Sequence, residues 1–437
     1  MARTTRITYA QCLVLGSPRP ADQDNTNNLT GLKRIQSADV DFAFSRKRFK
    51  QIGSTDYVGD INLTNPEISC QLNYFYTNGT NEVMLGLDVD QTRSTLNHLR
   101  APNQDNNYYI IFGTGINNQP LLETNDSNFV NKFNVMGLGN CHLNSYSIEG
   151  STNSLVSVSA TIQADNVALE PYNSSAGNPI PAITASTKLP SSNKYKVKKS
   201  FFQNTSNQDG LIDSAFAPSG IKLTLPTGNV PGLELSGSAG TAFINAFNLS
   251  FDIERVALYG FGSIYPYGRR ALMPTLGNLS FSAVASEFRD GNLYDLVKLD
   301  NNEEVEMDFQ IDLVNTSGTT GLQINIDRAK FDSQSFSESI NDFGQIDCQL
   351  SFSISDVTGL RFSTPPLILA QPEDASGPSG PLNIIATGHS PLSYKWYDTD
   401  GPTEVSTSQA YTAPVGDYYC VVSNDLGSAT SNTVSVV

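Results

Sequence analysis

The chain has 437 residues, which is enough for about three domains that each bury a core of their own. Its formal net charge of −16 argues against a protein that grips the phosphate backbone of nucleic acid, because such proteins present a basic stripe. Gly, Pro, Asn, Ser and Thr are abundant, only 16% of the residues are charged, and long segments of helical periodicity are rare. This composition predicts an all-β protein built from short strands and many turns.

The residue inventory offers little chemistry. The three histidines, His98, His142 and His389, are too few and too scattered for a hydrolase triad or a His-based metal site. The chain has no phosphate-binding loop, nucleophile elbow or dinucleotide fingerprint. Its five cysteines are widely spaced and odd in number, which favours reduced thiols made in a cytoplasm. We therefore expect a protein that is not an enzyme and that uses no cofactor and no metal.

Residues 1–30 are predicted to form a polar N-terminal arm. They include Pro18, Pro20 and an Asp- and Asn-rich run at 22–28, without a strong core pattern. The apolar run at 12–15 is too short for a secretory signal, and no segment approaches the ~20 apolar residues that span a bilayer. We expect no membrane insertion.

One stretch of alternating apolar and polar residues occurs twice. Residues 156–167 match residues 346–357 at an offset of 190 (346 − 156), and the strand block at 40–48 matches 247–255 at an offset of 207 (247 − 40). Because the blocks keep their order and phase, they predict a tandem duplication with domains at 31–171 and 194–364. The offset falls by 17 (207 − 190), which indicates an insertion in the first copy.

We place this insertion within residues 88–107. It contains a segment that reads as a short helix, capped by Asp90 and ended before Pro102, and residues 292–298 are predicted to hold the equivalent helix. The Pro- and Ser-rich residues 172–193 are predicted to be a linker. The basic cluster at 194–202 is interpreted as an edge strand that its lysines protect from open-ended pairing.

Residues 365–437 resemble an immunoglobulin-like domain. Trp396 lies on one predicted strand, and Tyr418 stands two positions before Cys420 on another. In the family, such a Trp packs between the sheets and such a Tyr forms a corner contact. The resemblance places the partner cysteine near position 384, which is Ile here, so Trp396, Tyr418 and Cys420 are expected to form the core without a disulfide.

The whole chain resembles the major tail tube proteins of long-tailed bacteriophages. The resemblance is carried by the block at 40–53, by residues 66–76, by their counterpart around 247–285 and by the Ig-like ending. It implies two tandem tail-tube-type β-sandwich or barrel domains, each with a short helix, followed by a C-terminal Ig-like sandwich.

Tail tube proteins form stacked rings, most with six single-domain copies, so two domains per chain imply homotrimeric, pseudo-hexameric rings. The implied partners are other copies, then the tape-measure protein and double-stranded DNA, which pass through the lumen without specific binding. The Ig-like domain is expected outside, with weak contact to host-surface glycans. Arg93, His98 and Arg100, in the insertion, are the candidates for contact between rings. The location implied is the virion tail, after synthesis in the host cytoplasm.

Three alternatives remain open. A tail fibre, spike or baseplate component that binds the host surface would also use β-sandwiches and Ig-like modules. A bacterial surface adhesin should carry an export signal. A glycan-cleaving enzyme would need a pair of catalytic acids, which the sequence does not identify.

Overall fold

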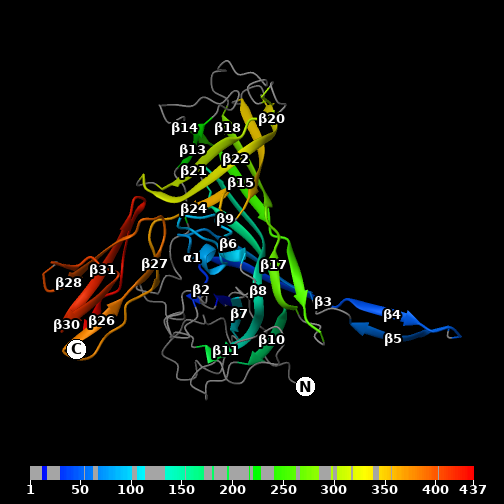
Figure 1. Cartoon of the computed structure of the whole chain (residues 1–437), viewed down its shortest axis with the longest axis horizontal. Helices are drawn as coiled ribbons and strands as arrows, with labels where there is room; N and C mark the ends of the chain where they lie inside the picture. Colours follow the sequence, from blue (N-terminus) through cyan, green and yellow to red (C-terminus); the bar gives the residue numbers. More distant parts are fainter. Residues whose placement is uncertain are drawn as a thin grey trace.

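The chain is all-β, with two large repeats and a smaller C-terminal sandwich (Figure 1). The computed structural model describes residues 12–16, 30–53, 55–62, 67–100, 106–113, 133–152, 154–171, 180–181, 194–195, 216, 220–227, 241–261, 266–284, 297–298, 303–315, 318–337, 344–355, 357–401 and 403–437.

The first repeat forms one antiparallel path in the order β3-β6-β9-β8-β7-β1-β2, and β10 also pairs with β8. Its strands alternate buried and exposed side chains, as in β9, because one face of the sheet covers the core. The elements are β1 (Cys12–Gly16), β2 (Thr30–Gly31), β3 (Ile35–Ala43), β4 (Arg46–Lys50), β5 (Tyr57–Asn62), β6 (Glu67–Phe75), α1 (Thr80–Met84), the 3-10 helix η3 (His98–Arg100), β7 (Asn106–Gly113), β8 (Phe133–Ser151), β9 (Ser157–Ala164) and β10 (Asn166–Pro171).

The second repeat has the same strand order, β15-β18-β23-β22-β21-β13-β14, with β24 on β22. Its elements are β13 (Gly220–Thr227), β14 (Thr241–Ile244), β15 (Ala246–Asp252), β16 (Arg255–Tyr259), β17 (Pro266–Ala271), β18 (Thr275–Val284), β19 (Val297–Lys298), β20 (Glu303–Glu304), β21 (Met307–Val314), β22 (Thr320–Ser337), β23 (Gln345–Ile354) and β24 (Leu360–Ser363). The duplication predicted from the sequence is therefore present in the topology.

The inner strands keep the offsets read from the sequence, but the outer strands do not. Leu72 of β6 lies opposite Ala160 of β9, and Leu279 of β18 lies opposite Leu350 of β23, which preserves the offsets of 207 and 190. However, Ala38 pairs with Leu72 whereas Leu249 pairs with Leu279, so β3 and β15 correspond at 211 (249 − 38). The sequence match of this strand at 207 is wrong by four residues. Alternation alone cannot detect a slip by a whole number of pleats.

The long strands β8 and β22 also differ from the sequence match. Tyr146 pairs with Ala160, and Phe331 pairs with Leu350, so Tyr146 corresponds to Phe331 rather than to Phe336. Both strands bend at a residue with positive φ, Asn140 in β8 and Arg328 in β22. Phe331 is 19 residues from its partner Leu350 (350 − 331), whereas Tyr146 is 14 residues from Ala160 (160 − 146), so the longer path from β22 to β23, with a bulge after Phe331, shifts the match.

The predicted arm, linker and helices are only partly described. Residues 12–16 of the arm are strand β1, paired with β7, so the arm prediction is wrong there; the rest of residues 1–29 lies outside the described residues. Within the predicted linker and the basic cluster, only β11 (Ile180–Pro181) and β12 (Lys194–Tyr195) are described, and they pair with each other.

The helix predicted at 90–99 is wrong, apart from the 3-10 turn that begins at His98. The Asp90 carboxylate accepts the Thr92 amide and hydroxyl in a local turn, and its backbone pairs with Ser363. The short helix of the first repeat is instead α1. Of the equivalent segment at 292–298, only Val297 and Lys298 are described, as strand β19.

The C-terminal sandwich has its own core, separate from that of the repeats. One sheet has the order β29-β28-β31-β32 with β33 on β31, and two further pairs are β26–β30 and β25–β27. The strands are β25 (Leu367–Ala370), β26 (Ser379–Asn383), β27 (Ile385–Thr387), β28 (Ser393–Asp398), β29 (Glu404–Ser406), β30 (Ala410–Pro414), β31 (Gly416–Asn424), β32 (Gly427–Thr430) and β33 (Val434–Val436).

Candidate assembly surfaces

The two repeats are joined edge to edge by β8 and β15. Seven residue pairs continue the antiparallel sheet from Ser145 opposite Asp252 to Ser151 opposite Ala246. At the centre of this joint the rings of Tyr146 and Phe251 stack with centroids 5.5 Å apart. Both side chains are buried, at 1% and 2% exposure. The result is one eight-stranded sheet in the order β3-β6-β9-β8-β15-β18-β23-β22.

This sheet ends in two edges that match the two sides of its own joint. β22 corresponds to β8, and β3 corresponds to β15. Among the described strands, nothing pairs with the outer edge of β3 or with the outer edge of β22 beyond its bend. An exposed strand edge offers unpaired N–H and C=O groups to another strand.

Side chains at these edges are only partly buried, in contrast to those at the joint. Ala38 and Val40 of β3 and Phe331 of β22 pack against the core but remain partly exposed. Their counterparts Leu249, Phe251 and Tyr146 are buried. Phe42, next on the same face of β3, is 60% exposed, whereas its counterpart Ile253 (42 + 211) is fully buried. The two open edges therefore repeat the strand positions of the joint, with their core-facing side chains only partly covered.

The other face of the eight-stranded sheet is polar. Hydrogen bonds run across it from strand to strand, as from Asn73 to Ser37 (2.8 Å), from Ser157 to Glu149 (2.7 Å) and from Ser351 to Asp332 (2.9 Å). Acidic side chains outnumber basic ones on this face. The acids are Asp39, Asp41, Glu67, Glu149, Asp252, Asp332 and Asp347, and the base is Lys330.

A buried carboxylate lies behind the joint. Glu82 of α1 is 1% exposed, and its Oε1 accepts hydrogen bonds from the hydroxyls of Tyr74 (2.9 Å) and Tyr146 (3.2 Å). Burial raises the pKa of Glu82 to about 6, although the two hydroxyls partly oppose the shift by stabilising the ionised form. The carboxyl is thereby linked to Tyr146, the ring that stacks on the second repeat.

The hairpin β16–β17 of the second repeat also binds the first repeat, and this contact is called the internal clasp. Arg255 donates to the carbonyl oxygens of Leu99 (3.0 Å) and Leu143 (3.5 Å), and Arg269 forms an ion pair with Asp165 in the β9–β10 turn. His142 is buried at the same place. Burial, followed by repulsion from the two arginines, lowers the pKa of His142 to about 3. The imidazole is thus neutral in the folded chain near pH 7.

The segment at 88–100, where the insertion was predicted, packs within the chain. The strand correspondences place only six extra residues of the first repeat between Leu72 and Asn107 (35 against 29) and thirteen between Asn107 and Asn140 (33 against 20), so most of the extra length does not lie where it was predicted. Ser94, Thr95 and Leu96 are fully buried. The Thr95 amide donates to the Leu360 carbonyl (2.9 Å), and the Thr95 hydroxyl accepts the Phe362 amide (2.7 Å), which ties this segment to β24.

The predicted ring-contact residues are spread along this segment. Arg93 is exposed, and the imidazole of His98 forms a short contact with the Asp88 carboxylate. Arg100 closes η3, and its side chain lies outside the described residues. The role of the three residues between rings stays a prediction.

The segment at 88–100 and the end of β24 also hold the Ig-like domain. The Ser390 amide donates to the Asp90 carbonyl (3.2 Å), and the His389 amide donates to that of Thr364 (2.9 Å). The Asn424 side chain donates to the Thr364 and His389 carbonyls, both at 3.0 Å.

The predicted Ig-like core residues are all buried. Trp396 and Cys420 are fully buried and lie directly opposite each other on β28 and β31, and Tyr418 is 2% exposed. Ile384 fills the position where the family has its other cysteine, and it is also fully buried. Cys420 is a free thiol, and burial raises its pKa to about 11, which makes it unreactive near neutral pH.

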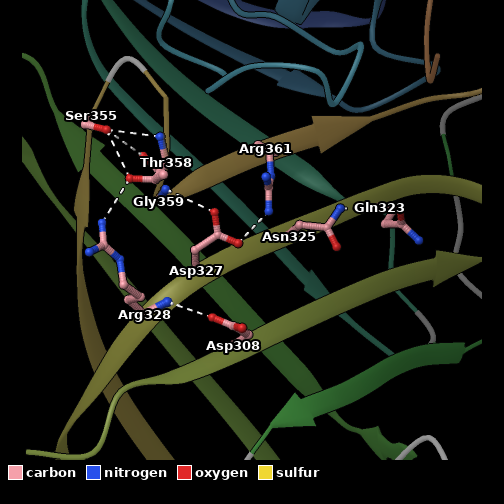
Figure 2. Close-up of polar contacts among 9 residues, drawn as sticks. All are labelled: Asp308, Gln323, Asn325, Asp327, Arg328, Ser355, Thr358, Gly359 and Arg361. Atoms are coloured by element: carbon pink, nitrogen blue, oxygen red, sulfur yellow. Dashed lines mark hydrogen bonds and ion pairs between the residues drawn. The ribbon is translucent and has the colours of Figure 1, made fainter. Parts of the chain in front are cut away.

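A polar cluster marks the bend of β22 (Figure 2). The Asp308 carboxylate accepts the Arg328 amide (3.0 Å), and Asp327 pairs with Arg361 (2.5 Å). The Arg328 guanidinium reaches the Thr358 hydroxyl (3.1 Å) in the β23–β24 turn. Sequence reasoning did not find this cluster or the strand edges, because neither carries a motif and both depend on which strands end the sheet.

Two kinds of site are not found in the described part of the chain. Among the described residues, no group of three or more His, Cys, Asp or Glu side chains is placed to hold a metal ion. No helix in that part is long and apolar enough to cross a membrane.

Comparison with known proteins gives only partial structural likenesses. No family model and no curated protein matches the chain. The tube-terminating cap of the anti-feeding prophage is similar over 33% of this chain and 87% of its own, at 18% identity and a TM-score of 0.21. The sheath–tube complex of an extracellular contractile injection system, PVC, is similar over 37% of this chain and 99% of its own, at 16% identity and a TM-score of 0.25. The tandem Ig repeats of Dlar cover 30% of this chain and 87% of their own, at 11% identity and a TM-score of 0.15. Scores of this size describe parts of a fold and carry no function.

Proposed function

We propose that this chain is a structural protein of a phage-type tail tube, in which the β22 edge of one copy pairs with the β3 edge of the next. The observation that supports the proposal is the match between the two open edges and the closed joint β8–β15. A contact of this kind is head to tail, and it closes into a ring when the rotation per copy divides a full turn. Given the resemblance to tubes with six domains per ring, three copies of two repeats make a homotrimer with pseudo-sixfold symmetry.

The internal joint gives the register of the proposed contact. Tyr146 opposite Phe251 corresponds to Phe331 opposite Val40 of the next copy. One step along, Ser145 opposite Asp252 corresponds to Lys330 opposite Asp41, a pair of opposite charge on the polar face. Directly opposed charges of opposite sign stabilise a sheet.

In a closed ring the polar face lines the lumen. Its acidic side chains repel phosphates, so double-stranded DNA passes through without sticking, after the tape-measure protein has left. The chain then acts in the virion tail as a conduit for DNA ejection, made beforehand in the host cytoplasm. It works without catalysis.

A second candidate is a fibre, spike or baseplate component that binds the host surface. It is favoured by the aromatic surface of the Ig-like domain, where Tyr397 and Tyr419 stack with centroids 5.3 Å apart and are partly exposed. Within the tube proposal, the same pair is a place for weak contact with host-surface glycans.

Negative-stain electron microscopy of the purified full-length chain tests the tube proposal. We expect rings or stacked tubes with a central hole. A matched variant, Val40→Lys, places a charge at the proposed contact and should leave single folded copies. Lone globules or rods from the unmodified chain at high concentration would contradict the tube and favour the second candidate.

A further inference from the structure

Among the described residues, the hairpin β4–β5 makes no contact with a repeat like the one that β16–β17 makes with the first repeat. In Figure 1, β17 runs beside β8 of the first repeat, whereas β4 and β5 project away from the body. Every residue of β4 is exposed. Large apolar side chains on and around this hairpin are also exposed, including Phe49 (48%), Tyr57 (54%) and Ile61 (51%). An exposed hairpin, here called the arm, that carries several large apolar side chains normally marks a contact surface.

The second repeat has a surface equivalent to the one that β16–β17 contacts on the first repeat. In the first repeat, the Asn140 amide donates to the side-chain oxygen of Asn107 (3.0 Å) at the bend of β8. In the second, the Arg328 amide donates to the Asp308 carboxylate (3.0 Å) at the bend of β22. The β9–β10 turn, with Asp165, corresponds to the β23–β24 turn, with Thr358. The cluster in Figure 2 is therefore the second copy of the surface that the internal hairpin covers.

The charged residues of the hairpin and of the surface differ between the two repeats. Arg46 and Arg48 of the arm stand where the internal hairpin has Ala257 and Tyr259 (46 + 211 and 48 + 211). The surface at the bend of β22 has Asp308 in place of Asn107. It also has Asp327 in place of Gly139. Asp327 precedes Arg328 and Gly139 precedes Asn140, the residues with positive φ at the two bends.

The ion pair between Arg269 and Asp165 inside the chain is replaced by uncharged residues at the corresponding positions of the arm and of the second repeat. Arg269, which meets Asp165 inside the chain, corresponds to Asn62 (269 − 207) of the arm. Asp165 corresponds to Thr358. Asp165 precedes Asn166, which pairs with Gly139, and Thr358 precedes Gly359, whose carbonyl accepts the Asp327 amide. The surface at the bend of β22 thus carries two carboxylates, Asp308 and Asp327, beside the guanidinium groups of Arg328 and Arg361. The pair that is charged inside the chain is neutral in both partners outside it.

We infer that the β4–β5 hairpin of each copy lies across the second repeat of the neighbouring copy, at the bend of β22 and the β23–β24 turn. This rests on the proposed ring, because the contact forms only if β3 of one copy joins β22 of the next. The arm then contacts the neighbouring copy within the same ring, as β16–β17 contacts the first repeat within one chain. It adds a second contact to the strand pairing.

Cross-linking with a short bismaleimide tests this placement. In the full-length chain, Arg46→Cys and Thr358→Cys are combined, since Arg46 corresponds to Ala257, the strand neighbour of Arg269. The control combines Lys47→Cys with Thr358→Cys, because adjacent strand residues point to opposite faces. The native cysteines whose side chains are described are buried. Rings are scored separately by microscopy.

We expect the Arg46→Cys pair to give covalent dimers and closed trimers in rings, at least tenfold more than the Lys47→Cys pair. Rings that form with equal, weak cross-linking of both pairs would overturn the lateral arm and leave the tube standing. Products larger than trimers, present only in stacked tubes, would place the arm between rings and also overturn it. Absence of rings from the unmodified chain would instead remove the tube itself.

Discussion

The closed joint between the repeats and the open edges of the sheet are built from the same strands with different surroundings. At the joint, Tyr146 and Phe251 are buried and stacked. At the edges, the corresponding Phe331 and Val40 are only partly covered. The same strand positions are therefore buried where the two repeats meet and partly exposed where the sheet ends. If this difference in burial is real, substitutions at the joint and at the edges should have unequal effects.

Truncating the joint should cost far more than truncating the edge. Phe251→Ala removes a buried aromatic ring, so we expect the free energy of unfolding to fall by about 3–5 kcal/mol. Val40→Ala, at the corresponding edge position, should cost under about 1.5 kcal/mol in the isolated chain because its side chain is already partly solvated. Urea unfolding followed by circular dichroism measures both. Equal losses would show that the edge is as well packed as the joint.

The contribution of the internal clasp to the free energy of unfolding should fall in acid. Because the pKa of His142 is lowered to about 3, this histidine stabilises the fold above its unfolded pKa, and this contribution is lost as the pH falls below about 6.5. We expect a loss of about 2 kcal/mol at pH 5 relative to pH 8. In His142→Gln this part of the pH dependence should vanish. An unchanged pH profile would mean that the clasp does not depend on a neutral imidazole.

The Glu82 carboxyl behind the joint should change the free energy of unfolding with pH in the opposite direction to His142. The pKa of Glu82 is raised to about 6, so its contribution is fully present below its unfolded pKa and is lost as the pH rises through about 6. Glu82→Gln keeps an acceptor for Tyr74 and Tyr146, and we expect it to stabilise the chain at pH 8 by up to about 2 kcal/mol. Unfolding titrations from pH 4 to pH 8 give the comparison. Destabilisation by this variant at pH 8 would contradict the assigned pKa.

The smallest effect is that of a single charge pair at the open edges. Asp41→Lys and Lys330→Asp should each reduce ring formation, because each places like charges opposite each other, and the double variant should restore it. Each contact contributes about 0.2–1 kcal/mol. Sedimentation velocity measures the assembled fraction. Failure of the double variant to recover, with both single variants folded, would contradict the proposed register.

Sequence reasoning reached the fold class, the duplication and the Ig-like core, because alternation and the Trp396, Tyr418 and Cys420 spacing are local signals. It missed the true register of the outer strands, where Val40 corresponds to Phe251 rather than to Phe247. A slip of four residues preserves alternation, and only cross-strand partners fix it. The helix predicted from Asp90 failed because tertiary hydrogen bonds to β24 and to Ser390 hold this segment in an irregular path.

Electron cryomicroscopy of the assembled full-length chain would show directly how the copies meet. We expect a closed ring of three copies in which β22 continues into β3 of the next copy, with Lys330 opposite Asp41 and Phe331 opposite Val40. A ring whose copies meet through any other surface, with both edges left unpaired, would contradict this expectation.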